Sequence, residues 1–389
     1  MSGHLPIQSM VPLVSSRAQE NCHELEKRVN ILGKLIRDII YYPLYWFRDK
    51  GAKNNGNKNS KKLAHEEAYY KRFWTGQEPQ DLNLEYADII RERYVIYDQP
   101  VIILAKNGKK ITTVCRVIET KECPKEGVFN ALLLPGSLST LDNNLFIFYD
   151  FLVAHASQEN SSPGRFFIFG HYEMTIEAES KSSTVYKPSS FEACGKALKR
   201  TLETLQEHFG KFNLIFAQSA GCFTLAALLK CSGPELLPTM LHFDRGPSSI
   251  YEASRHYWFG KLLYVIAKLS GLTFYVDREI TSFFNRCAVA DYLNLQKSTC
   301  IITGVEEDSV YPGPAGLVSS SCLDGFQKKL KFTKWVFNPP AQINHPRAHH
   351  NWRLMCFNKS YLTYTNGNIE MLSKENLAQA ILRLAQITD

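Results

Sequence analysis

Short apolar runs alternate with longer amphipathic stretches over most of the chain after about residue 86. The runs are rich in β-branched and aromatic residues and end in Gly, Pro or polar positions, a pattern that predicts β-strands. We expect strands within residues 92–98, 110–120, 130–137, 165–173, 214–218, 238–244, 298–312 and 328–340. The last two of these are expected to be the final two strands of the sheet.

The amphipathic stretches between these runs predict helices. The clearest one covers residues 188–210, where Ser189 and Glu192 have the spacing of a capping box and Gly210 stops the pattern. One face of this helix carries the three- and four-residue spacing of a core-facing surface through Phe191, Gly195, Leu198, Leu202, Leu205 and Phe209. Other helices are expected in residues 142–157, 222–229 and 374–386.

The alternation of strands and helices predicts the fold class. It indicates an α/β protein with a mostly parallel sheet that helices cover on both faces. The first two strands are separated by the turn sequence Asn107-Gly108, so they predict an antiparallel edge.

The amino-terminal part has a different pattern, which divides the chain into three regions. Residues 1–48 form an expected amphipathic helical extension, whose apolar face carries Leu25, Val29, Leu32, Ile36, Ile39 and Ile40. Residues 49–85 form a Gly-, Asn- and Lys-rich linker followed by a short helix. Residues 86–389 form the main domain, with an aromatic-rich insertion at about residues 246–298.

Composition narrows the function classes. The 389-residue chain has a mild net charge of +7, much of it in residues 53–62, so no nucleic-acid partner is expected. No apolar run reaches the ~18–20 residues needed to cross a bilayer, and a cleavable signal pattern is lacking. The ten cysteines show no metal-type spacing. We therefore expect reduced thiols, a cytoplasmic location, and neither a metal nor a cofactor.

The stretch "LIFAQSAGCFTLAALL" (residues 214–229) carries the clearest chemical signal. Its apolar strand ends at Ser219, and an apolar helix follows at once. A sharp strand-to-helix turn with small neighbours exposes one strained residue above a sheet, which is the geometry of a nucleophile elbow. Ala217 stands where glycine is usual, and it meets the same requirement for small size. The pattern predicts that Ser219 is a nucleophile.

A serine hydroxyl needs a base and an acid to become nucleophilic, in the chain order Ser, acid, His. The acid is expected after the next-to-last strand, where Glu306, Glu307 and Asp308 are candidates, and Asp244 after the preceding strand is the fallback. The base is expected after the last strand, which is followed by the candidates His345, His349 and His350.

Acyl transfer also needs hydrogen-bond donors for the oxyanion. One expected donor is the backbone N–H of Ala220, the residue after the nucleophile. The other is expected in the loop after residues 130–134, at Gly136, Ser137 or Leu138.

Over about residues 86–389 the chain resembles the α/β-hydrolase superfamily. The matching segments are "LLLPGS", "AQSAG", "GVEEDSVYP" and "AHHNW", in that family's order. The resemblance implies an eight-stranded, mostly parallel sheet, a helical lid and an acyl-enzyme mechanism. Because Asp308 begins an Asp-x-Val-x-Pro run similar to the family's acid loop, the resemblance favours Asp308 as the acid. "AHHNW" is similar to the loop that leads into the family's final helix, which favours His350 as the base, with His349 and His345 as alternatives.

The function expected from these features is that of a serine hydrolase acting on a small-molecule ester or thioester. The aromatic lid favours a lipid-like substrate, although its side chains would equally well close a small core of their own. Residues 24–50 either lie on a membrane surface or dock on the main domain. Two alternatives stay open: a peptidase or acyltransferase with the same triad, and a non-catalytic α/β-hydrolase scaffold that binds a membrane or a protein partner.

Overall fold

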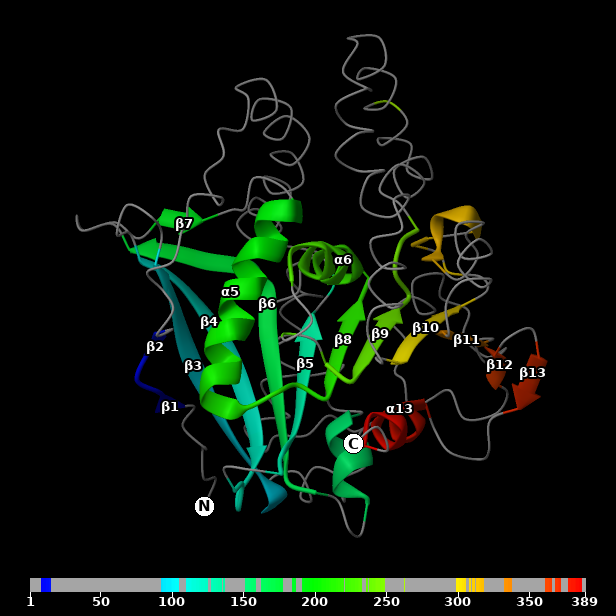
Figure 1. Ribbon diagram of the computed structural model, residues 1–389, viewed down its shortest axis with the longest axis horizontal. Coiled ribbons are helices and arrows are strands. Elements are labelled where there is room, and N and C mark those ends of the chain that lie inside the picture. Colours follow the sequence, from blue (N-terminus) through cyan, green and yellow to red (C-terminus); the bar gives the residue numbers. More distant parts are fainter. Residues whose placement is uncertain are drawn as a thin grey trace, which may run out of the picture.

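The computed structural model places one sheet at the centre of the molecule (Figure 1). It describes residues 8–14, 92–104, 110–124, 127–134, 136, 151–158, 162–177, 184–186, 191–219, 221–232, 236, 238–248, 262, 299–305, 308, 310–311, 313–317, 332–337, 361–365, 368–371 and 377–386.

Eight strands form the central part of the sheet, as the sequence predicted. In spatial order they are β3 (Tyr94–Leu104), β4 (Lys110–Thr120), β6 (Gly164–Glu177), β5 (Phe129–Leu134), β8 (Leu214–Gln218), β9 (Met240–Asp244), β10 (Thr299–Val305) and β11 (Phe332–Phe337). Strand β4 runs antiparallel to both neighbours, and all pairings from β6 to β11 are parallel. The expected α/β fold with an antiparallel edge is therefore confirmed.

The sheet extends beyond these eight strands. Short strands that the pattern did not predict, β1 (Gln8–Ser9) and β2 (Leu13–Val14), pair with β3, and β7 (Thr184–Tyr186) pairs with β6. Two residues of strand are too short to show a hydrophobic period, because alternation needs about four residues to be recognised.

The expectation that residues 328–340 contain the last strand was wrong. A hairpin of β12 (Tyr361–Thr365) and β13 (Asn368–Met371) follows and pairs antiparallel with β11. The chain between "AHHNW" and the final helix therefore contains two strands instead of leading straight into that helix. A sequence signal for the hairpin exists, since the two residues between these strands are Asn366 and Gly367, a common hairpin turn pair.

Three helices have full bounds in the structure: α5 (Phe191–Phe209), α6 (Gly221–Cys231) and α13 (Leu377–Gln386). Residues 151–156 are also helical, within the stretch where a helix was expected. Gly210 has a φ of 85°, the left-handed conformation that ends a helix at little cost for glycine, as predicted for the end of α5.

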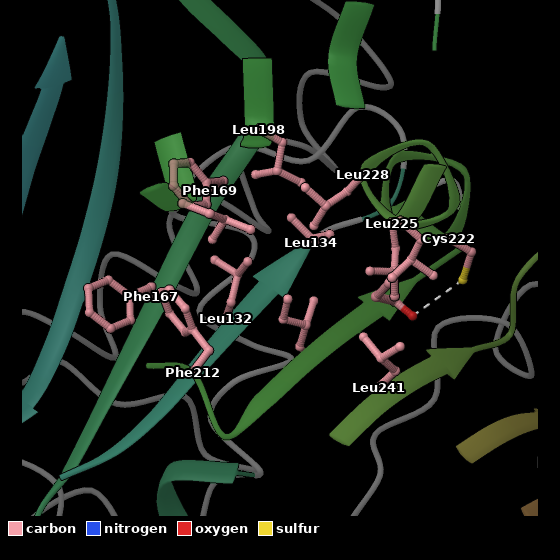
Figure 2. Packing of buried hydrophobic residues seen from close by; sticks show 14 of the residues in the cluster. Leu132, Leu134, Phe167, Phe169, Leu198, Phe212, Cys222, Leu225, Leu228 and Leu241 are labelled. Atoms are coloured by element: carbon pink, nitrogen blue, oxygen red, sulfur yellow. Dashed lines mark hydrogen bonds between the residues drawn. The ribbon is translucent and has the colours of Figure 1, made fainter. Parts of the chain in front are cut away.

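Helices α5 and α6 cover one face of the sheet (Figures 1 and 2). Alternate residues of the strands point toward them because successive side chains of a strand lie on opposite faces. The resulting core brings together residues from β5, β6 and β8 with both helices, among them Leu132, Leu134, Phe167, Phe169, Leu198, Leu225 and Leu228.

The opposite face of the sheet is covered in part by the helical residues 151–156. The Phe151 and Phe216 rings meet edge to face with centroids 5.0 Å apart, and the His155 and Phe166 rings do so at 5.4 Å. Tyr94 Oη lies 2.6 Å from His155 Nδ1, and His155 Nε2 lies 3.0 Å from the Ser162 carbonyl oxygen. A carbonyl only accepts, so Nε2 carries the proton and the Tyr94 hydroxyl donates to Nδ1.

Several expectations fall outside the described residues. They include the expected amphipathic helical extension except for residues 8–14, the linker and short helix of residues 49–85, and nearly all of the expected lid, of which only residues 246–248 and Leu262 are described. Among helices in the described ranges, none is long and apolar enough to span a membrane.

The close contact between α5 and α6 depends on Gly195 of α5. A Cβ atom at this position would lie 2.5 Å from the backbone carbonyl carbon and oxygen of Ala227 in α6. Backbone atoms in a packed helix cannot move away from an added Cβ atom as the end of a flexible side chain can. Glycine is therefore required for the two helices to lie this close.

We expect Gly195→Ala to lower the free energy of unfolding by about 1–2 kcal/mol, because the overpacking cost exceeds the gain in helix propensity. Thermal and urea unfolding followed by circular dichroism measures this. Lys211→Ala, at an exposed position just after the same helix, is the control and should change stability by less than about 0.5 kcal/mol. A Gly195→Ala protein more stable than the wild type would contradict the close contact.

Candidate active site at the carboxyl ends of the strands

Ser219 occupies a sharp turn between β8 and α6. The strand ends at Gln218, the helix begins at Gly221, and Ser219 between them has a φ of 51°. A left-handed backbone is costly for a non-glycine residue and persists only where its surroundings enforce it. The sharp strand-to-helix turn that the sequence predicted is therefore present, with Ser219 in a left-handed backbone.

Hydrogen bonds on both sides hold the turn in place. The Ser219 N–H donates to the Asp244 carbonyl oxygen at the end of β9 (2.9 Å), and the Cys222 N–H donates to the Ser219 carbonyl oxygen (3.0 Å). The strained residue is thus anchored to the neighbouring strand and to the first turn of α6.

Gly136 lies against the Ser219 side chain from the β5 side. A Cβ atom added at residue 136 would lie 3.0 Å from Ser219 Cβ and 3.4 Å from Ser219 Oγ. The absence of a side chain there leaves the backbone after β5 next to the serine hydroxyl. This is the place where an oxyanion donor was expected.

Asp308 follows β10 and is 5% exposed. Its Oδ1 accepts hydrogen bonds from the backbone N–H groups of Val310 (2.8 Å) and Tyr311 (3.1 Å). An aspartate that accepts bonds from residues two and three positions later fixes the local turn. The carboxylate therefore shapes the loop in which it stands.

Tyr311 brings this loop to the serine, a contact that the sequence analysis missed. Its hydroxyl oxygen lies 3.4 Å from Ser219 Oγ, longer than the about 2.7–2.8 Å typical of O–H···O bonds. The spacing Asp308-x-x-Tyr311 is a signal for an aspartate-stabilised turn. It says nothing, however, about which strand the tyrosine side chain would reach.

Asp244, the fallback acid, is fully buried and engaged in a polar network. Its Oδ1 accepts from the Thr303 hydroxyl at 2.7 Å, and its Oδ2 accepts from Arg245 Nε at 2.9 Å. Arg245 is itself buried, has a φ of 46°, and donates its backbone N–H to the Thr303 carbonyl oxygen (2.8 Å). The network joins the ends of β9 and β10 beneath the serine turn.

His242 extends this network through Thr303, on the face of the sheet opposite to α5 and α6. Its Nε2 lies 2.7 Å from Thr303 Oγ1. Because the single Thr303 hydroxyl proton goes to Asp244, Nε2 must carry the proton and Nδ1 is the bare nitrogen, which has no hydrogen-bond partner within the described ranges. Burial lowers the pKa of His242 to about 4, so the imidazole is neutral at pH 7.

Cys222 is the nucleophilic side chain nearest in sequence to Ser219, and it is unsuited to chemistry. The thiol is buried, its Sγ lies 3.3 Å from the Ala217 carbonyl oxygen, and burial raises its pKa well above the ordinary value. The thiolate is the reactive form of cysteine, so this thiol is inert at neutral pH.

The other expected site residues lie outside the described part of the chain. They are Ala220, Ser137, Leu138, Glu306, Glu307, His345, His349 and His350. Of the expected set, the structure therefore describes Ser219, Asp308, Asp244 and Gly136, and links the first three through backbone bonds and Tyr311. Within the described ranges no group of three or more His, Cys, Asp or Glu residues could hold a metal ion.

Replacing Thr303 tests the buried network. Thr303→Val keeps the shape but removes the hydroxyl that bridges His242 and Asp244, and it leaves their polar atoms buried without this partner. We expect a loss of about 1–3 kcal/mol in the free energy of unfolding, measured by urea denaturation.

Thr112→Val is the matched control for this change. The Thr112 hydroxyl in β4 is buried and lacks a hydrogen-bond partner among the described residues. Removing it should leave stability unchanged or raise it. Equal effects of the two substitutions would show that the Thr303 bridge contributes nothing.

Comparisons with known proteins give matches at the level of structure. No protein-family model matches the chain, and the comparison with curated proteins found no significant match. An esterase from Pyrococcus furiosus is 14% identical with a TM-score of 0.38, over 66% of this chain and 87% of that one. An esterase/lipase from an uncultured bacterium is 13% identical with a TM-score of 0.41, over 84% and 96%.

A third similar structure is brefeldin A esterase, described as a bacterial homologue of human hormone-sensitive lipase. It is 14% identical with a TM-score of 0.36, over 72% of this chain and 77% of that one. Other similar structures are described as peptidases, among them an acylaminoacyl peptidase from Pyrococcus horikoshii. Because these TM-scores are low, the function proposed for this chain rests on the geometry around Ser219.

Proposed function

We propose that this protein is a serine hydrolase that cleaves an ester or thioester through an acyl-enzyme on Ser219. The observation that carries the proposal is the left-handed backbone of Ser219 at the junction of β8 and α6. Residues that their surroundings hold in this conformation are common at active sites, and in a strand-to-helix turn it presents the side chain above the sheet, where a nucleophile is needed.

The positions around the turn support the same chemistry. The hydroxyl is half-buried, Gly136 leaves room beside it, and the first turn of α6 directs its positive dipole end toward the serine. Negative charge that develops on a substrate oxygen at this point would be stabilised by that dipole and by backbone N–H groups. The proposed donors are the Ala220 N–H and a second N–H from the loop after β5, at Gly136, Ser137 or Leu138.

Asp308 is the proposed acid of the triad. Asp244 already pairs with Arg245 and Thr303 in a fully buried site, so its carboxylate has a structural role. Asp308 stands in the loop that carries Tyr311 to the serine. The proposed base is His350, with His349 and His345 as the alternatives, because a triad needs a histidine from the chain after β11.

The substrate class follows from the proposed chemistry and from the composition of the lid. An ester or thioester has the carbonyl that a serine alkoxide attacks and a leaving group that departs with one proton. The apolar and aromatic residues of the lid, such as Trp258 and Phe259, favour a lipid-like acyl chain.

Labelling with a fluorophosphonate probe tests the nucleophile. We expect the wild type to be labelled and Ser219→Ala to be unlabelled, since the probe reacts with activated serines. Ser157→Ala, at an exposed serine distant in sequence from Ser219, is the matched control and should label like the wild type. Labelling that persists in Ser219→Ala would exclude Ser219 as the nucleophile. A folded wild type that is never labelled, with or without mild detergent, would favour a non-catalytic scaffold.

The two acidic candidates are separated by parallel substitutions. Asp308→Asn keeps an amide oxygen for the Val310 and Tyr311 N–H groups, so we expect a folded protein with roughly 10³–10⁴-fold lower kcat. Asp244→Asn leaves Arg245 buried without its countercharge and should lower the free energy of unfolding by about 3–5 kcal/mol. Full activity in Asp308→Asn would refute its role as the acid.

A further inference from the structure

Tyr311 and Gly136 flank the Ser219 side chain from opposite directions. Gly136 follows β5, which lies on one side of β8, and Tyr311 follows β10, which lies two strands away on the other side. Figure 1 shows the strands in this order, with the arrowheads of β5, β8, β9 and β10 toward the same edge of the sheet. A carbonyl group bound over Ser219 would therefore have its oxyanion near Gly136 and its leaving group near Tyr311.

The backbone around Tyr311 is held in place on both sides. Its N–H donates to Asp308 Oδ1, and its carbonyl oxygen would lie 2.8 Å from a Cβ atom added at Gly316. The residues that follow pair with the segment after β9, through the bonds from Leu317 N–H to the Gly246 carbonyl oxygen (2.8 Å) and from Ser248 N–H to the Ala315 carbonyl oxygen (2.7 Å). A hydroxyl presented by such a braced loop is a preorganised donor.

We propose that Tyr311 is a catalytic residue of this site, whose phenol hydroxyl donates a hydrogen bond to the leaving-group oxygen of the ester that acylates Ser219. The inference rests on the proposed serine hydrolase function. The 3.4 Å between the two hydroxyl oxygens leaves the tyrosine close enough to reach an oxygen bonded to the carbon that Ser219 attacks.

The acylation step balances without a further reactant. Ser219 Oγ forms a bond to the carbonyl carbon while the histidine base takes the hydroxyl proton. The bond from that carbon to the leaving oxygen then breaks, and the histidine returns the same proton to this oxygen. Tyr311 transfers no proton and stabilises the negative charge that gathers on the leaving oxygen before the proton arrives.

The Tyr311 hydroxyl should affect the rate of hydrolysis only where the leaving oxygen carries a concentrated negative charge. An alkoxide is a strongly basic leaving group, whereas a nitrophenolate spreads its charge over the ring and departs readily. Removing the phenol hydroxyl should therefore slow hydrolysis of an alkyl ester by about 10–100-fold and that of a nitrophenyl ester by less than about threefold.

The experiment compares the wild type with Tyr311→Phe on ethyl and p-nitrophenyl esters of one acyl chain, chosen as the length that the wild type hydrolyses fastest. The measured quantity is the ratio of kcat/KM between the two esters. Partial misfolding lowers both rates by the same factor, so it leaves this ratio unchanged. Tyr97→Phe, on the distant strand β3, is the matched control and should keep the wild-type ratio.

A selective fall for the ethyl ester in Tyr311→Phe supports the proposal. An equal fall for both esters overturns it and assigns Tyr311 to holding the Ser219 hydroxyl, and an unchanged pair of rates also overturns it. The proposed function itself, and the role of Tyr311 with it, is overturned by either of two results. One is that Ser219→Ala hydrolyses both esters like the wild type, and the other is that the wild type hydrolyses neither ester at any acyl chain length.

Discussion

The candidate site depends on the hydrogen bond between the Ser219 N–H and the Asp244 carbonyl oxygen. This bond pulls the end of β8 against the end of β9 and helps hold Ser219 in a left-handed backbone that an isolated chain would leave. The first turn of α6 then begins directly after the serine. The contacts that Gly136 and Tyr311 make with the Ser219 side chain depend on the position that this turn gives it.

A buried polar network supports the strand end to which Ser219 is anchored. Asp244 and Arg245 bury opposite charges, Thr303 bridges Asp244 to His242, and the Arg245 N–H returns to the Thr303 carbonyl. Buried charges are tolerated only when paired and hydrogen-bonded, so the parts of this network hold one another in place. The network thus joins the ends of β9 and β10, and the bond from the Ser219 N–H to the Asp244 carbonyl oxygen connects the end of β8 to it.

Loops from two directions meet over the serine. Gly136 approaches because it has no side chain, and Tyr311 arrives on a loop that Asp308 folds through its own backbone bonds. Glycine at 136 and tyrosine at 311 thus give the two sides of Ser219 different chemistry, with exposed backbone on one side and a phenol on the other. An ester carbonyl has the same asymmetry between its oxyanion and its leaving group.

Local pattern determined most of the central sheet and the serine turn. Continuous apolar runs predicted the central strands β5 and β8, which are buried on both faces, and β-branched and aromatic runs predicted the strands nearer the edges. "AQSAG" predicted the turn because small residues are required beside it. The two-residue strands β1 and β2 carried too little pattern to be recognised. The hairpin of β12 and β13 had a turn signal in Asn366-Gly367, but nothing in that signal says that it joins this sheet.

The partners of the acidic residues were decided only by tertiary structure. In sequence, Asp244 and Asp308 both follow a strand and both are acceptable acids. The structure gives them different partners, because β9 and β10 lie side by side, which brings Thr303 to Asp244, while Tyr311 of the Asp308 loop reaches Ser219. Such pairings join residues far apart along the chain, and no local period of apolar and polar positions records them.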